Sequence, residues 1–293
     1  QVSQGGIPAT ISRAIAPDPA HFFTLDPPSI DLLAAEDEKE AVPYRFAVNL
    51  PADLDICRDG TFTRNSDGTN VWRLNIKSPG AQALLLYFDR YEVPAGGRLF
   101  VYNPARTQIL GAFTNENNNK HSTFATGLIN GEELTIEYNG LDGMPLPLLH
   151  VSEVGYAYRG INSKTRGATG FGGAGSCEVN INCAEGAYSQ IEKRSVARIS
   201  VKRGNGTLWC TGSLVNNVRN DGTPYFLTAD HCGRYSSEID LTQWIFYFNY
   251  ETGGCPGPNV EPASNSMTGA TLVGHGGNAA ASGSDFFLVL LSS

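Results

Sequence analysis

Short apolar runs separated by turn signals follow the first 45 residues of the chain. Residues 83–88 (ALLLYF) and 99–102 (LFVY) are apolar, and residues 134–138 (LTIEY) alternate between apolar and polar positions. Asp-Gly and Asn-Gly pairs recur between these runs. Such spacing is typical of antiparallel strands in a β-sandwich. We therefore predict a β-sandwich domain over residues 46–158.

A second set of strand patterns begins after residue 194. Residues 195–201 alternate between polar and apolar positions, and an Asn-Gly turn at 205–206 leads into the next run. The further apolar runs are 207–215, 224–229, 243–248 and 286–291. Consecutive antiparallel hairpins of this kind predict a small β-barrel. The predicted fold class is all-β.

Two segments flank the sandwich. Residues 1–45 form a proline-rich and then acidic leader, with a short helix over 29–36 capped by Ser29 and a solvated acidic run at 36–40. Residues 159–176 are rich in glycine and cannot form a core, so we predict a linker there. A cut near Lys164 or Arg166 would separate the sandwich from residues 177–293.

Composition and charge exclude several classes of function. The formal net charge is -8, which opposes the neutralisation of phosphates and therefore nucleic-acid binding. No apolar run approaches the roughly 20 residues that cross a bilayer, so no membrane partner is expected and the protein should be soluble. Five of the six cysteines follow residue 176, which fits disulfide formation. Since the chain opens with Gln1, we expect a secreted protein whose signal peptide has been removed or left out.

His231 is the histidine with the most informative setting, FLTADHCG at residues 226–233. Its neighbour Asp230 competes as an orienting carboxylate. On a strand the two side chains point to opposite faces, so we expect Asp230 to be exposed and not bonded to His231. His121 and His150 lie away from cysteine-rich or carboxylate-rich patterns, and surface or structural roles are expected for both.

The stretches WCTGSLV (209–215) and FLTADHC (226–232) together resemble the paired strands around the catalytic histidine of trypsin-like serine proteases. GSCEVNINC (175–183) and FNY (248–250) ahead of Cys255 make bacterial lysyl endopeptidases the most similar subfamily. The preceding sandwich looks like the propeptide of secreted members. The resemblance implies that this sandwich packs on its own protease domain and that the substrates are proteins or peptides.

The resemblance also assigns residues. His231 would be the general base, and Asp285 in SDFFLVLL would orient it, although Phe287 is larger than the residue usual at that position. A histidine can take the proton of a serine hydroxyl when a carboxylate fixes its tautomer.

Cysteine pairing follows from the same resemblance. It implies disulfides Cys210–Cys232 and Cys183–Cys255, while the family partner of Cys177 lies later in the enzyme. Cys57 is left either free or paired irregularly with Cys177. The spacing does not favour a zinc site. Five residues separate Cys177 and Cys183, and His231 is adjacent to Cys232, whereas zinc ligands usually follow a C-x₂₋₄-C spacing. No cofactor is expected.

The serine nucleophile is absent from the sequence pattern. No G-[DS]-S-G-[GS] turn follows Asp285, and residues 177–293 number 117, enough for one of the two barrels of this fold. We therefore expect the N-terminal half of a secreted serine endopeptidase precursor, inactive as this chain alone. The alternative is a non-catalytic binding or adhesion protein with a vestigial half-barrel. Cleavage specificity is not predicted.

Overall fold

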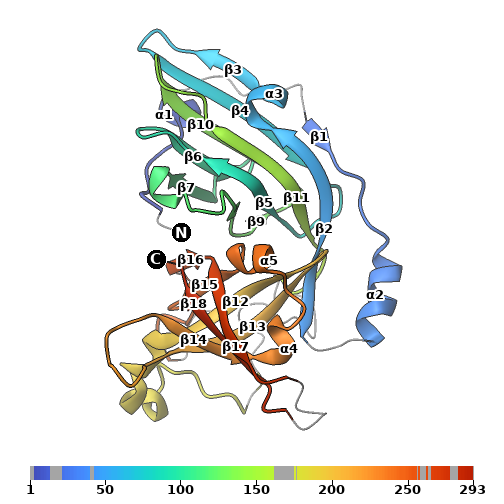
Figure 1. Cartoon of the computed structure of the whole chain (residues 1–293). Coiled ribbons are helices and arrows are strands. Elements are labelled where there is room, and N and C mark those ends of the chain that lie inside the picture. The colour runs from blue at the N-terminus through green and yellow to red at the C-terminus, as the bar shows by residue number, and fades with distance from the viewer. Residues whose placement is uncertain are drawn as a thin grey trace. The chain divides into compact units, whose positions relative to one another are not determined.

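The structure is a computed structural model that describes residues 3–13, 22–39, 43–161, 175, 177–255, 257, 262, 265–277 and 283–292. Over these residues the chain is mainly β, and its strand ladders form two open sheets (Figure 1). Contacts between Cα atoms divide the chain into two units. Unit 1 is Gln1–Ser29 with Asn49–Tyr158, and unit 2 is Ile30–Val48 with Arg159–Ser293. Most of the predicted linker, with Lys164 and Arg166, lies outside the described residues.

Unit 1 holds two layers of strands. The first layer contains β1 (Phe22–Thr24), β3 (Thr61–Arg64), β4 (Thr69–Lys77), β6 (Arg98–Tyr102), β7 (Ile109–Phe113) and β10 (Glu133–Leu141). The second contains β5 (Ala83–Glu92), β8 (Phe124–Ala125), β9 (Ile129–Asn130), β11 (Leu148–Ala157) and the later part of β2 (Tyr44–Asp55). Phe113 and Phe124 join the layers, with ring centroids 5.0 Å apart. Short helices α1 (Ala9–Ser12), α3 (Ile56–Asp59) and η1 (Asn115–Asn117) complete the unit.

His150 of β11 is buried between two carboxylates of unit 1. Its Nδ1 lies 2.5 Å from Asp89 Oδ1, and its Nε2 lies 2.7 Å from Asp53 Oδ1. Of the surface or structural roles expected for His150, its burial fits the structural one, and the sequence pattern does not reveal the two partners, which lie 61 and 97 residues away. Burial alone lowers the pKa of His150, yet the hydrogen bonds to Asp89 and Asp53 outweigh burial and raise the pKa above 6.5.

This arrangement predicts that unit 1 loses stability as the pH rises. Because the folded-state pKa of His150 is raised, its contribution is fully present below 6.5 and is lost as the pH rises through the higher folded value. Urea unfolding of the chain, followed between pH 6 and pH 9, should show this fall. His150→Asn should flatten it, whereas His121→Asn, at an exposed position, should not. An unchanged pH profile in His150→Asn would contradict the assignment.

Helix α2 (Ile30–Lys39) opens unit 2 directly after Ser29, which confirms the predicted helix. The prediction that its acidic run is solvated is wrong for Asp37, whose side chain is buried. Arg45 Nε donates to Asp37 Oδ1 at 2.9 Å, and a terminal nitrogen of Arg159 lies 2.9 Å from Oδ2. Two guanidinium partners offset the cost of burying this charge, and sequence spacing alone does not show them.

Seven further strands form the ladder of unit 2, which runs in the order β16, β15, β12, β13, β14, β18, β17. Their bounds are β12 (Val196–Arg203), β13 (Gly206–Val215), β14 (Tyr225–Ala229), β15 (Ile245–Phe248), β16 (Asn265–Thr268), β17 (Ala270–His275) and β18 (Phe286–Leu291). The first residues of β2 pair with β13 as well. The helical elements are η2 (Ala184–Ser189), η3 (Glu192–Ser195), α4 (Asp230–Gly233) and α5 (Glu238–Thr242). The predicted hairpin at Asn205-Gly206 is confirmed as the turn between β12 and β13.

The two end strands of this ladder, β16 and β17, are separated in the chain only by Gly269. Gly269 has φ +95°, a conformation that favours glycine. Its N–H donates to the Trp244 carbonyl at 2.8 Å, and its carbonyl accepts from Ser292 N–H at 3.0 Å. Among the described strands no ladder closes the ring, so the sheet is open and the predicted barrel is not established by the strand pairing.

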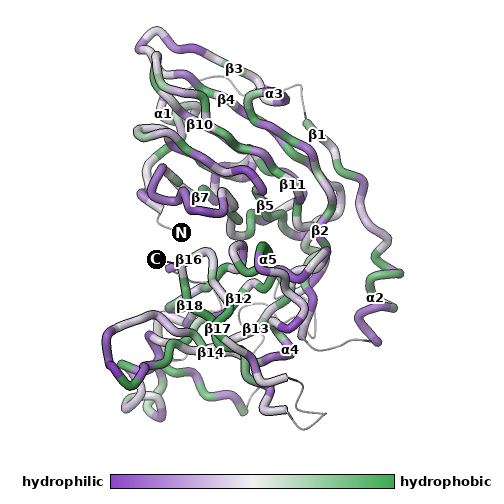
Figure 2. Tube along the Cα trace, viewed as in Figure 1, coloured by the Kyte–Doolittle hydropathy of each residue, from purple (hydrophilic) through white to green (hydrophobic). Residues whose placement is uncertain are grey.

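One apolar core lies inside unit 2. It collects side chains from β12, β13, β14, β15, β17, β18 and α5, and Trp244 within it is fully buried. Phe226 and Phe246 pack edge to face with centroids 5.0 Å apart. The apolar residues of these strands can be followed in Figure 2. None of the described helices combines the length and apolarity that crossing a bilayer requires.

Candidate functional site

His231 lies in the helical turn α4, which starts where β14 ends at Ala229. The prediction that the histidine sits on a strand is therefore wrong by two residues. The turn begins with Asp230 N–H donating to the Asp285 carbonyl at 2.9 Å. This bond fixes the start of α4 beside the residue that precedes β18.

Asp285 has φ +49°, in the left-handed region that residues other than glycine seldom adopt. Its N–H donates to the Gly277 carbonyl at 3.1 Å, and its carbonyl accepts from Asp230. Both backbone groups of Asp285 are therefore occupied. The Asp285 backbone is held by the nearby residue Gly277 and by Asp230, which is distant in sequence.

The structure brings His231 and Asp285 together through two hydrogen bonds. His231 Nδ1 lies 2.8 Å from Asp285 Oδ2, and the backbone N–H of His231 donates to Oδ1 at 2.9 Å. The ring bond, then the backbone bond, hold the pKa of Asp285 below 3.8 against the opposing effect of burial. The carboxylate is therefore ionised at neutral pH and favours the tautomer with the proton on Nδ1, which leaves Nε2 able to accept a proton.

Both side chains remain partly open, with 35% of His231 and 28% of Asp285 exposed. Within the described residues, no serine hydroxyl is hydrogen-bonded to His231. Ser213, the serine of the WCTGSLV motif, instead pairs with Ser195 at 2.8 Å between hydroxyl oxygens. The described residues therefore present a histidine and a carboxylate without a nucleophile.

Asp230 is buried, with 1% of its surface exposed, so the expectation that it is exposed is wrong. As expected, it does not bond the His231 ring. Its Oδ1 lies 2.8 Å from Nδ1 of His275, the last residue of β17. Sequence reasoning missed this second Asp-His pair, and the one signal for it is a histidine set among glycines in GHGG at 274–277.

Both disulfides implied by the resemblance are formed, Cys210–Cys232 and Cys183–Cys255. The first ties β13 to the residue after His231. Cys210, Cys232 and His231 have side-chain atoms within 4.8 Å of one another, but the disulfide occupies both sulfurs and removes the thiolates that a metal would need.

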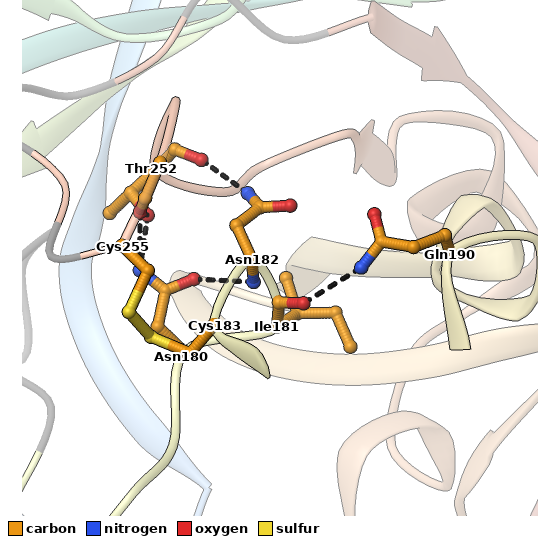
Figure 3. The surroundings of a disulfide bond; sticks show 8 residues. Asn180, Ile181, Asn182, Cys183, Gln190, Thr252 and Cys255 are labelled. Carbon is orange, nitrogen blue, oxygen red and sulfur yellow. Dashed lines mark hydrogen bonds between the residues drawn. A yellow bond between two sulfur atoms is a disulfide. The ribbon is translucent and has the colours of Figure 1, made fainter. Parts of the chain in front are cut away.

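The second disulfide joins the segment before η2 to the loop after β15, as Figure 3 shows. Asn182 supports it, since Asn182 Nδ2 donates to the Thr252 carbonyl at 2.5 Å. Cys57 and Cys177 are free. Burial, and then the charge of Asp55, raise the pKa of the Cys57 thiol to about 11.

A pocket of about 780 Å³ lies within unit 2, and β13 contributes Trp209, Cys210, Thr211 and Ser213 to its lining. The guanidinium carbon of Arg198 lies 3.5 Å from the ring centroid of Trp209, and Arg198 also donates to the Tyr250 hydroxyl at 2.7 Å. Glu192 and Lys193 add charges to the wall. Cys210 lines this pocket, and its disulfide partner, Cys232, follows His231 in the sequence.

Comparison with known proteins points to the same part of the chain. The family described as "Lysyl endopeptidase, C-terminal domain" matches residues 171–293. A lysyl endopeptidase of Pseudomonas aeruginosa is 27% identical over 113 residues, which are 36% of this chain and 24% of the relative. The chain thus spans about a quarter of the length of that relative. No solved structure matches significantly. The chain is therefore distantly similar to lysyl endopeptidase over its C-terminal region.

Proposed function

We propose that residues 177–293 supply the general base and its orienting carboxylate to a secreted serine endopeptidase of the trypsin-like class. The observation that carries this proposal is the double hydrogen bond from His231 to Asp285. A carboxylate on Nδ1 stabilises the imidazolium that forms when Nε2 removes the proton from a serine hydroxyl. The same ring then returns the proton to the leaving amine.

The strand arrangement of unit 2 supports the trypsin-like assignment. The ends of its ladder meet in sequence at Gly269, which is hydrogen-bonded toward both neighbouring segments, and a single core lies inside. In this proposal the strands form the first barrel of the protease. Asp285 and His231 lie at its rim, where a second barrel would cover their exposed surface.

The other parts of the proposal follow from the same assignment. In this proposal the serine comes from outside residues 1–293, because no G-[DS]-S-G-[GS] turn follows Asp285 in the sequence. Unit 1 acts as the propeptide and packs on its own protease domain. The two disulfides fit folding outside the cytoplasm, where proteins or peptides would be the substrates. The relative from Pseudomonas aeruginosa carries the name of an endopeptidase, which supports the reaction class.

A fluorophosphonate probe tests this proposal, because it reacts with the activated serine of such enzymes. The chain of residues 1–293 should not label, whereas a longer secreted product containing it should label and cleave protein substrates. His231→Ala in that product should reduce both by at least about 10³-fold. His275 is left unaltered in this experiment.

Two outcomes would count against the proposal. Labelling of a serine within residues 1–293 would show that the site is placed wrongly. A longer product that neither labels nor cleaves, while unit 1 binds a carbohydrate or peptide, would favour the binding or adhesion alternative.

A further inference from the structure

The backbone of Asp285 is held in a left-handed conformation from two sides. Asp230, at the start of α4, donates its N–H to the Asp285 carbonyl at 2.9 Å. Gly277, just after β17, accepts the Asp285 N–H at 3.1 Å. A non-glycine residue with φ +49° persists only where its surroundings determine it, so the relative position of α4 and the end of β17 sets the conformation of Asp285.

A partly buried side-chain bond between Asp230 and His275 connects these two segments. Asp230 Oδ1 accepts from His275 Nδ1 at 2.8 Å. His275 ends β17, and the next residue, Gly276, donates its N–H to the Phe286 carbonyl at 2.8 Å. The pair therefore joins the two segments whose backbone groups are hydrogen-bonded to Asp285.

The chemistry of Asp230 argues against a role in stability alone. The residue is 1% exposed, and among the described residues its Oδ2 has no hydrogen-bond partner. A buried carboxylate with one unsatisfied oxygen is unfavourable for folding, and an apolar residue would avoid that cost. A requirement for a charged acceptor facing His275 explains why the position holds an acid.

We propose that Asp230 and His275 are positioning residues whose hydrogen bond sets the orientation of the Asp285 carboxylate on His231. The pair touches neither the reacting atoms nor a substrate. It acts by keeping α4 and the end of β17 at the separation that the two backbone bonds of Asp285 require. The importance of this orientation for catalysis rests on the proposed function. The effect of the Asp230–His275 bond on the conformation of Asp285 does not.

NMR on the whole chain, uniformly labelled with ¹⁵N, can measure how the Asp230–His275 bond affects Asp285. The label reports on both the histidine ring nitrogens and the backbone amides. His231→Asn assigns the ring Nδ1 proton that is bonded to Asp285. His275→Ala should shift that proton or lose it to solvent exchange, and should speed exchange of the Asp285 amide about tenfold, the factor that one ordinary hydrogen bond supplies. His275→Asn keeps a donor close to the position of Nδ1 and should restore both signals.

The control is His121→Ala, at an exposed position of unit 1, which should leave both signals unchanged. If His275→Ala also leaves them unchanged, the proposal is wrong. Asp230→Ala should reproduce the effect of His275→Ala. If it does not fold, the variants at His275, whose side chain is 46% exposed, still decide.

The outcome is separable from the protease assignment. Shifted signals in the chain, together with a longer secreted product that cleaves no peptide, would uphold the positioning role and refute the enzyme. In an active longer product, His275→Ala should lower kcat with little change in KM. Unchanged kcat and unchanged spectra in such an enzyme would refute the positioning role alone.

Discussion

Replacing Asp285 with asparagine should lower kcat of the proposed endopeptidase by about 10⁴-fold, because an amide facing His231 favours the wrong tautomer of the ring. Asp285 Oδ2 accepts from Nδ1, so the proton resides there and Nε2 is free to act as the base. An asparagine that turns its Nδ2 toward the ring would force the proton onto Nε2. The measurement is kcat and KM of the longer secreted product on a protein substrate.

Asp221→Asn is the matched control, since it makes the same chemical change at an exposed position of unit 2. It should leave kcat within a factor of about two. Circular dichroism and the Asp285 amide exchange rate must show that the Asp285→Asn variant is folded. A folded variant with nearly full kcat would remove Asp285 from the mechanism and leave His231 without its orienting group.

The His231–Asp285 pair could be predicted because the motifs around both residues resemble those of trypsin-like serine proteases. His231 follows a strand and precedes a cysteine, and Asp285 directly precedes an apolar run of six residues. In the structure the end of β14 lies beside the start of β18, because the two strands pair antiparallel with Ala229 opposite Phe286. The distance between the side chains follows from that pairing.

The environment of Asp230 could not be predicted in the same way. Alternation along a strand places it opposite His231, but the strand ends at Ala229 and Asp230 begins a helical turn. Its partner, His275, is 45 residues away, and the glycines around it in GHGG do not indicate a carboxylate partner. Burial of a charged residue is decided by such distant partners, as it is for Asp37 and His150.

Phe287 is larger than the residue usual at this position in the proteases that the sequence resembles, and the structure accommodates it. The side chain is almost fully buried and stacks on Trp244, with ring centroids 5.8 Å apart. Gly233 makes room for it, because a Cβ at that glycine would lie 2.6 Å from the Phe287 ring. A large residue at 287 therefore goes together with the absence of a side chain at 233, a compensation across 54 positions that neither motif reveals alone.

Removing the Cys183–Cys255 disulfide should destabilise unit 2 more than removing Cys210–Cys232. The bridges span 72 and 22 positions of sequence, and the chain-entropy treatment gives losses of about 4 and about 3 kcal/mol, respectively. The hydrogen bonds around Cys183, such as that from Asn182 to Thr252, involve neighbouring residues and should survive a double replacement by serine. The difference between the two losses of unfolding free energy should therefore come from the conformational entropy of the unfolded chain.

Urea unfolding without reductant measures the loss of unfolding free energy for each bridge, provided that the tryptophan fluorescence reports on unit 2. Trp209 and Trp244 lie in unit 2 and Trp72 in unit 1, so a Trp72→Phe background confines the fluorescence change to unit 2. Cys177→Ser, at an exposed free thiol, is the control and should change the free energy of unfolding by less than about 0.5 kcal/mol. A larger loss on removal of Cys210–Cys232 would contradict this prediction. The native geometry around His231, rather than loop length, would then determine how much each bridge stabilises unit 2, because of the two bridges only Cys210–Cys232 joins α4, the turn of the proposed base, to β13.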